Sequence, residues 1–133
     1  MCIRDRGSGE GTRILTPNYT MYSVEEDIKF VGLTDSNYLY VPTDKTGWYD
    51  RVILKRLLST IPAYQLMIVD GPKGGRNRTG LLKNLDLFDL TIPWLFDEVN
   101  RPVDLETATN FSVLTNKHMM VFNSVDKQFA ILL

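Results

Sequence analysis

The sequence of 133 residues has a single cysteine, a single histidine, almost no net charge, and no apolar run long enough to cross a bilayer. One cysteine, Cys2, excludes an internal disulfide and is typical of a cytoplasmic protein. A net charge of −1 does not indicate nucleic acid or an anionic membrane as a partner. No signal peptide is visible, so we expect a cytoplasmic protein with one domain and a single core.

The most informative stretch is the apolar run at residues 66–69, which ends in Asp70 and a segment rich in glycine and proline. Such a run predicts a strand buried on both faces, as in parallel sheets covered by helices. Ligands of open α/β sheets bind at the carboxyl ends of the strands. Asp70 is therefore a candidate to bind a cation, accept a ligand hydroxyl, or take a proton. The alternative is that Asp70 only caps the following turn.

Apolar and turn-forming residues predict the other elements. We expect strands at residues 21–25, 38–41, 91–96, 118–122 and 128–133, and helices at 27–31, 48–58, 81–88 and from 102 onward. The alternation of strands and helices predicts an α/β fold with a mostly parallel sheet and helices on both faces. Only residues 123–127 separate the last two strands, so these form an antiparallel hairpin.

Acidic residues also end two other predicted strands. Glu25 ends the strand at 21–25, and Asp97 and Glu98 follow the strand at 91–96. A charged strand end that faces solvent is the alternative for Glu25. Arg78 follows Asp70 in the chain, and Arg101 follows Asp97 and Glu98. The two arginines either hold an acidic acceptor or form ion pairs with these same acids. The sequence leaves both alternatives open, and we interpret His118 as structural.

Small residues near the N-terminus form a further candidate site. They are Gly7, Ser8, Gly9 and Gly11. They indicate either a flexible linker or a turn between a strand and a helix where a ligand approaches the backbone. Residues 1–6, MCIRDR, resemble an adapter-derived hexapeptide that recurs at the ends of reading frames in metagenomic assemblies. We therefore expect residues 1–6 to be artefactual, residues 7–133 to form the single domain, and the first strand to be missing or replaced.

Together these motifs resemble the class I S-adenosylmethionine-dependent methyltransferases. The small residues at 7–11 are similar to the glycine loop against the methionine part of the cofactor. Glu25 matches the acid that ends the second strand and binds the ribose hydroxyls, and Asp70 matches the fourth-strand acid near the transferred methyl group. The final hairpin matches the reversed seventh strand of that family. The resemblance implies a Rossmann-like sheet and S-adenosylmethionine as the cofactor.

A narrower resemblance is to O-methyltransferases that act on glucuronic acid in plant xylan. Its motifs are Val24-Glu25-Glu26, Val69-Asp70-Gly71-Pro72, Arg78-x-Gly80 and Glu98-Val99-Asn100-Arg101. The chain is also similar to catechol-type O-methyltransferases, in which acids of the fourth and fifth strands hold magnesium. That resemblance implies Asp70, Asp97 and Glu98 as Mg²⁺ ligands, although the family has Asp-Asn where this chain has Asp97-Glu98.

The expected reaction is O-methylation of a small-molecule or sugar hydroxyl. A hydroxyl is a poor nucleophile, so the transfer needs alignment and a base or a metal. Asp70 is the candidate for that catalytic role, and Arg78 and Arg101 are candidates to bind an acidic saccharide acceptor. One alternative is a nucleotide-binding oxidoreductase, which the glycine spacing and the terminal hairpin disfavour. The other is a non-catalytic Rossmann-like cofactor-binding fragment.

Overall fold

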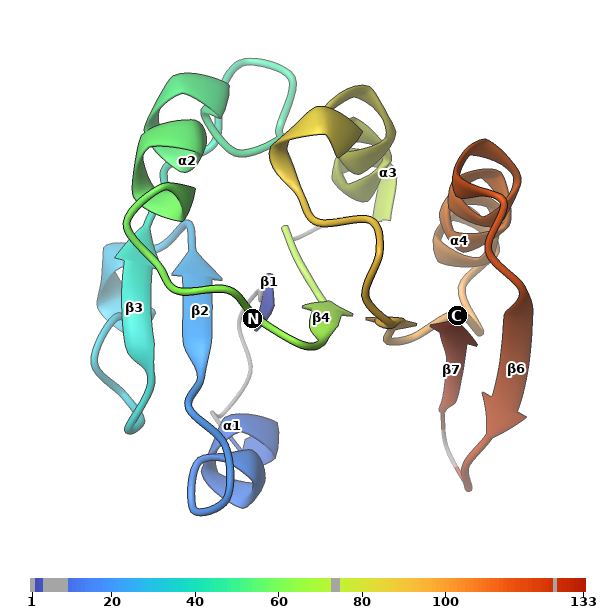
Figure 1. Ribbon diagram of the computed structural model, residues 1–133, viewed down its shortest axis with the longest axis horizontal. Helices are drawn as coiled ribbons and strands as arrows, with labels where there is room; N and C mark the ends of the chain where they lie inside the picture. Colours follow the sequence, from blue (N-terminus) through green and yellow to red (C-terminus); the bar gives the residue numbers. More distant parts are fainter. Residues whose placement is uncertain (1, 4–9, 73–74, 126) are drawn as a thin grey trace.

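The computed structural model describes residues 2–3, 10–72, 75–125 and 127–133. In this part of the chain the strands form one sheet in the order β3-β2-β1-β4-β5-β7-β6 (Figure 1). The strands are β1 (Cys2–Ile3), β2 (Tyr22–Glu25), β3 (Asn37–Tyr40), β4 (Met67–Val69), β5 (Trp94–Phe96), β6 (Met119–Asn123) and β7 (Gln128–Leu132). Strands β1 to β5 pair in parallel, and β7 pairs antiparallel with both β5 and β6. The predicted closing hairpin is confirmed.

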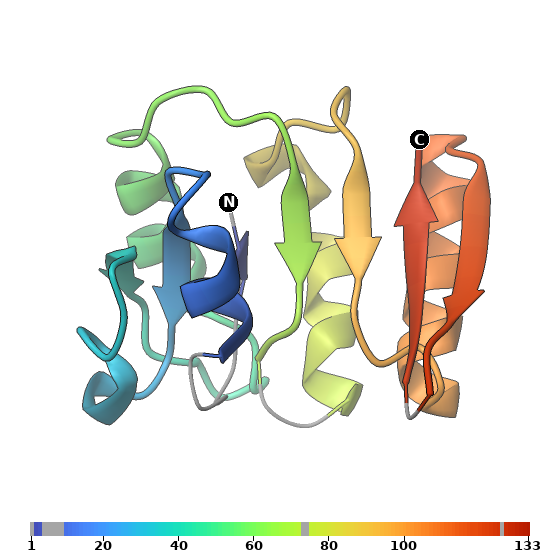
Figure 2. The same ribbon diagram turned by 90° about the horizontal axis from the view of Figure 1, so that it is seen from below.

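Helices lie on both faces of the sheet. They are α1 (Glu10–Leu15), α2 (Arg51–Leu58), α3 (Gly75–Arg78) and α4 (Pro102–Thr115), with 3₁₀ turns η1 (Ile28–Phe30), η2 (Thr79–Lys83) and η3 (Leu85–Leu87). Figure 2 shows α1 on one face of the sheet and α2, α3 and α4 on the other. The mixed α/β fold is therefore as the sequence predicted. No helix in the described part of the chain combines the length and the apolar character that a membrane span requires.

Strand β1 lies in the middle of the parallel part of the sheet. Ile3 is aligned with Val24 of β2 on one side and with Val69 of β4 on the other. The sequence predicted that the first strand would be missing or replaced, and a strand of two residues, Cys2–Ile3, lies at that place. The artefactual origin of residues 1–6 stays a prediction.

The core lies between the sheet and the helices α2 to α4. Trp94 of β5 is fully buried, and its ring centroid lies 5.7 Å from that of Phe88, 6.4 Å from that of Phe96 and 4.6 Å from that of Phe111. In β4, Met67 and Val69 are buried on this side. Ile68, which alternates with them, is only half-buried. The prediction that β4 is buried on both faces is thus correct for one face only.

Helix α2 begins three residues later than predicted, at Arg51. The carboxylate of Asp50 accepts hydrogen bonds from the backbone N–H groups of Val52 and Ile53, at 3.0 and 2.9 Å, and so caps the helix. Trp48, predicted to lie on the apolar face of the helix, is instead buried in the loop before it. Val52, predicted for the same face, is exposed.

The helix predicted at residues 81–88 is replaced by the 3₁₀ turns η2 and η3. The side-chain amide of Asn84 donates to the carbonyl of Gly80 at 2.8 Å, which is the acceptor that the Asn84 backbone N–H would use in an α-helix. The backbone N–H of Asn84 donates to Leu81 instead, at 2.9 Å. This shift to the shorter hydrogen-bond spacing ends the first 3₁₀ turn at Lys83.

Helix α4 was predicted correctly, and its buried side was predicted in part. The spacing of Leu105, Ala108, Phe111 and Leu114 predicted the buried face. Ala108 and Phe111 are buried, whereas Leu105 and Leu114 are exposed. The helix is rotated so that Asp104 and Thr107 are buried as well. A buried carboxylate requires charged or hydrogen-bonding partners, and those of Asp104 belong to the site below.

Candidate functional site

Three acidic residues stand at the carboxyl ends of parallel strands, at one level of the sheet. Val24 and Val69 are both aligned with Ile3, and Val69 is also aligned with Phe96. Their successors, Glu25, Asp70 and Asp97, therefore lie along the same edge. Strands in a sheet are about 4.8 Å apart, so the backbone positions of Glu25 and Asp70, two strands apart, are separated by about 10 Å. This register agrees with the expectation that Glu25 and Asp70 both stand at strand ends of one mostly parallel sheet.

Glu25 is buried, with 3% of its surface exposed. Its Oε1 accepts a hydrogen bond from the backbone N–H of Asp27 at 3.0 Å. Burial raises the pKa of Glu25 above its ordinary value, and the negative charges of Glu26 and Asp27 raise it further, while backbone hydrogen bonds from the same two residues oppose the shift. Glu25 is therefore a desolvated acceptor at the end of β2, which differs from the charged, solvent-facing strand end that was the alternative.

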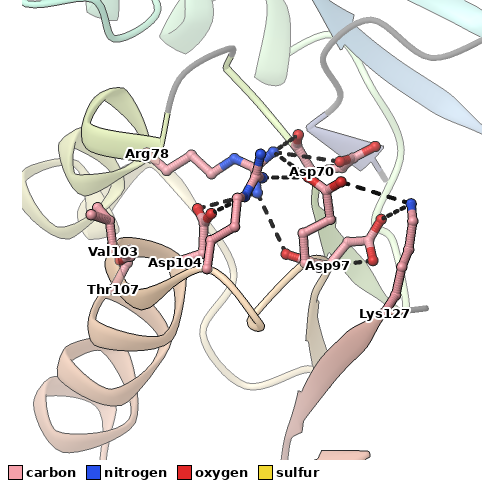
Figure 3. A network of polar contacts seen from close by, with 9 residues as sticks. Asp70, Arg78, Asp97, Val103, Asp104, Thr107 and Lys127 are labelled. Carbon is pink, nitrogen blue, oxygen red and sulfur yellow. Dashed lines mark hydrogen bonds and ion pairs between the residues drawn. The ribbon is translucent and has the colours of Figure 1, made fainter. Parts of the chain in front are cut away.

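Arg78 connects the ends of β4 and β5 (Figure 3). Its side chain is 6% exposed. Nη2 donates to the backbone carbonyl of Asp70 and lies 3.5 Å from Asp70 Oδ1. Nη1 donates to the backbone carbonyl of Asp97 at 3.4 Å. The guanidinium of Arg78 thus contacts the backbone at the ends of both β4 and β5.

Asp104, in the first turn of α4, holds the other side of this guanidinium. The Asp104 side chain is 2% exposed, and its Oδ1 accepts from Arg78 Nη1 at 3.2 Å. Its Oδ2 accepts from Arg101 Nε at 2.6 Å. The sequence analysis used residue 104 only as part of a helix start and missed this role. The signal present in the sequence was an acid three residues after Arg101, at a helix N-terminus.

Glu98 and Lys127 complete the cluster. Glu98 has a φ of 59°, in the left-handed region that non-glycine residues seldom adopt. Its Oε2 forms an ion pair with Arg101 Nη2 and lies 3.7 Å from Arg78 Nη2. Lys127, from the turn between β6 and β7, places Nζ 3.8 Å from both Asp97 Oδ2 and Glu98 Oε1. Sequence reasoning also missed Lys127, which it treated as part of a short link.

These ion pairs involve the three acids that were predicted to hold Mg²⁺. In the residues that the model describes, no group of three histidine, cysteine, aspartate or glutamate side chains is arranged to hold a metal ion. Asp70, Asp97 and Glu98 are near one another, but the cations of Arg78 and Lys127 lie against them. The arrangement does not fit the metal site that the resemblance to catechol-type enzymes implied, because the protein supplies the positive charge itself.

The remaining predicted site residues are placed as follows. Gly7, Ser8 and Gly9 lie outside the described residues, and Gly11 lies within helix α1, so the predicted turn does not extend to residue 11. Arg78 and Arg101 are both paired with the neighbouring acids, which is the second of the two alternatives that the sequence left open. The backbone of His118 pairs with Leu133, away from the strand ends that carry the acids.

Comparison with protein-family models gives no match for this chain, and comparison with curated proteins gives none either.

Proposed function

We propose that the chain is a class I S-adenosylmethionine-dependent methyltransferase that methylates a hydroxyl of a small molecule or sugar. The observation that carries the proposal is the common level of Glu25 and Asp70 on the two sides of β1. The order of the sheet reverses between β1 and β4, because β2 and β3 lie on one side of β1 and β4 and β5 on the other. Ligands of open α/β sheets bind outside the carboxyl ends of the strands at such a switch point.

The far end of the sheet supports a methyltransferase over a dinucleotide-binding oxidoreductase. The common dinucleotide-binding order continues from the fifth strand to a sixth that is parallel to it. Here the antiparallel β7 lies between β5 and β6. An antiparallel strand at this place matches the reversed strand of the family that the sequence resembles, and this match supports our proposal of a Rossmann-like sheet of the methyltransferase type.

The residues of the chain have distinct roles in this proposal. S-adenosylmethionine supplies an electrophilic methyl group on a sulfonium. Glu25, buried and rich in lone pairs, accepts hydrogen bonds from the ribose hydroxyls. Asp70 would contact the cofactor beside its methyl group and take the proton of an acceptor hydroxyl that is aligned with that methyl group. The acids near Asp70 are paired with Arg78 and Lys127, so these roles are assigned without a metal ion.

The proposal is tested by calorimetric titration of the folded chain with S-adenosylmethionine and, separately, with NAD⁺. We expect binding of S-adenosylmethionine alone. Transfer of a labelled methyl group to a panel of neutral and acidic glycosides then identifies the acceptor. Binding of NAD⁺ alone would instead support an oxidoreductase. Binding without transfer would support the non-catalytic alternative.

A further inference from the structure

We infer that Arg78 is a positioning residue that fixes Asp70 at the end of β4, and that it does not bind the acceptor. The inference rests on the proposed function, in which Asp70 takes the proton of the acceptor. It starts from one contact: Arg78 Nη2 donates to the backbone carbonyl of Asp70 and also lies 3.5 Å from its carboxylate. Both the main chain and the side chain of Asp70 are therefore held by the same nitrogen.

The guanidinium is itself fixed by a second element. Nη1 binds Asp104 Oδ1 at 3.2 Å and the carbonyl of Asp97 at 3.4 Å, so α4 and the end of β5 both orient it. Figure 3 shows Arg78 between Asp104 on one side and Asp70 on the other. The position of Asp70 at the end of β4 thus depends on the planar guanidinium of Arg78, which contacts both α4 and the end of β5.

This geometry is specific to arginine. The two terminal nitrogens of Arg78 make all of these contacts, while its buried Nε has no hydrogen-bond partner among the described residues. A lysine carries one compact ammonium, which can neutralise a carboxylate. It cannot contact Asp70 and Asp104 from two separate nitrogens, as the guanidinium does. The positioning function is therefore expected to be lost in the charge-conserving variant Arg78→Lys.

The buried ion pair with Asp104 argues against the acceptor-binding role. The side chain of Arg78 is 6% exposed, whereas that of Arg101 is 44% exposed. To bind an acceptor carboxylate, Arg78 would have to leave Asp104, a carboxylate that is itself buried. Breaking a buried pair leaves an uncompensated charge and is strongly unfavourable. The positive charge of Arg78 is therefore compensated by acidic side chains of the protein itself.

The test compares Arg78→Lys with Arg51→Lys as a matched control. Arg51 also forms a two-nitrogen ion pair, with Asp86, but both side chains are exposed and belong to α2 and η3. Three quantities are measured for each variant: unfolding in urea, the ¹⁵N shift of the Gly71 amide, and calorimetric affinity for S-adenosylmethionine. The Gly71 amide shares its peptide group with the Asp70 carbonyl, so its shift reports the contact with Arg78 independently of binding.

We expect Arg78→Lys to stay folded, to move the Gly71 signal, and to weaken S-adenosylmethionine binding by about tenfold, the scale of one charge-assisted hydrogen bond. Arg51→Lys should change neither. Because Arg78 acts through Asp70, combining Arg78→Lys with Asp70→Asn should weaken binding no more than Asp70→Asn alone. A merely structural role for Arg78 would give additive losses.

An unmoved Gly71 signal, or additive losses in the double variant, would overturn the inference. If Arg78→Lys does not fold, Asp104→Asn keeps Arg78 but removes the charge that holds it, and it should move the same Gly71 signal. If the wild-type chain binds no S-adenosylmethionine, the proposed function fails. The Gly71 signal then still decides whether Arg78 holds Asp70, so the two failures are distinguishable.

Discussion

Glu25 and Asp70 end their strands at the same level, on either side of β1, because Val24 and Val69 are both aligned with Ile3. The two acids differ in their surroundings. Glu25 is desolvated and accepts a backbone hydrogen bond, whereas Asp70 is partly exposed and held by Arg78. Two carboxylates in different environments at one sheet edge suit two roles, one in binding and one in proton transfer.

The pH dependence of stability should report the environment of Glu25. Burial raises the pKa of Glu25, so the folded chain binds this proton more tightly than the unfolded chain does. The contribution of Glu25 to stability therefore falls as pH rises from the ordinary carboxyl pKa through the raised one. Relative to the wild type, Glu25→Gln should be more stable at about pH 7 than at about pH 4. Urea unfolding at both pH values measures this, and an equal difference at the two would contradict it.

Removal of Asp104 should destabilise the chain strongly. Asp104 is buried and pairs with both Arg78 and Arg101. Asp104→Ala removes the buried carboxylate that pairs with the guanidinium of Arg78, a change that costs about 3–5 kcal/mol of unfolding free energy. Asp86→Ala, which removes the exposed partner of Arg51, is the matched control and should have little effect. If urea unfolding gave similar losses of unfolding free energy for both variants, the buried ion pair would contribute no more to stability than the exposed one.

Trp94 should be a main contributor to core packing. It is fully buried, and its ring contacts Phe88, Phe96 and Phe111. Trp94→Ala removes this aromatic volume and leaves a cavity, with an expected loss of about 3–5 kcal/mol. Val113→Ala on α4 is the control, because Val113 is 75% exposed. If chemical denaturation showed a smaller loss of unfolding free energy for Trp94→Ala than for Val113→Ala, Trp94 would not be a main contributor to core packing.

Strand β1 should limit stability. Among the described residues it provides two to the sheet between β2 and β4, whereas β2 has four and β4 three. Replacing residues 1–6 with a β-branched run that ends in an acid should extend the strand and raise the melting temperature, by about 4 °C for each kcal/mol gained. A permuted MCIRDR segment serves as the control. Equal melting temperature and equal S-adenosylmethionine affinity would indicate that residues 1–6 belong to the protein.

Local patterns in the sequence were sufficient for most of the strands. The apolar runs ending at Glu25, Val69 and Phe96 were predicted with their last residues correct, because a strand that stops at an acid or a turn has a sharp local signal. The hairpin of β6 and β7 followed from the length of its link. The helix at 81–88 was wrong because the hydrogen bond from Asn84 to Gly80 competes with helical pairing, and apolar spacing does not record such a bond.

The site was only partly visible in the sequence. Glu25, Asp70 and Asp97 were found from their positions after strands, but the order of strands that aligns them requires tertiary pairing. Asp104 and Lys127 escaped notice because each belongs to an element that the fold brings to the strand ends from elsewhere in the chain. The sequence also left open whether Arg78 pairs with protein acids or with an acceptor, since burial distinguishes these and has no local signature.

The most direct test of the proposed cofactor site is to compare the calorimetric affinities of Glu25→Ala and of the wild type for S-adenosylmethionine. The account predicts that the wild type binds, and that the folded variant binds more weakly because ribose contacts are lost. Each lost charge-assisted hydrogen bond is worth up to about 1.5–3 kcal/mol. Asp86→Ala, which removes an exposed partner of Arg51 in α2, should bind as the wild type does. A folded wild type that binds no S-adenosylmethionine, or a Glu25→Ala variant with unchanged affinity, would contradict the assignment of this sheet edge as the cofactor site.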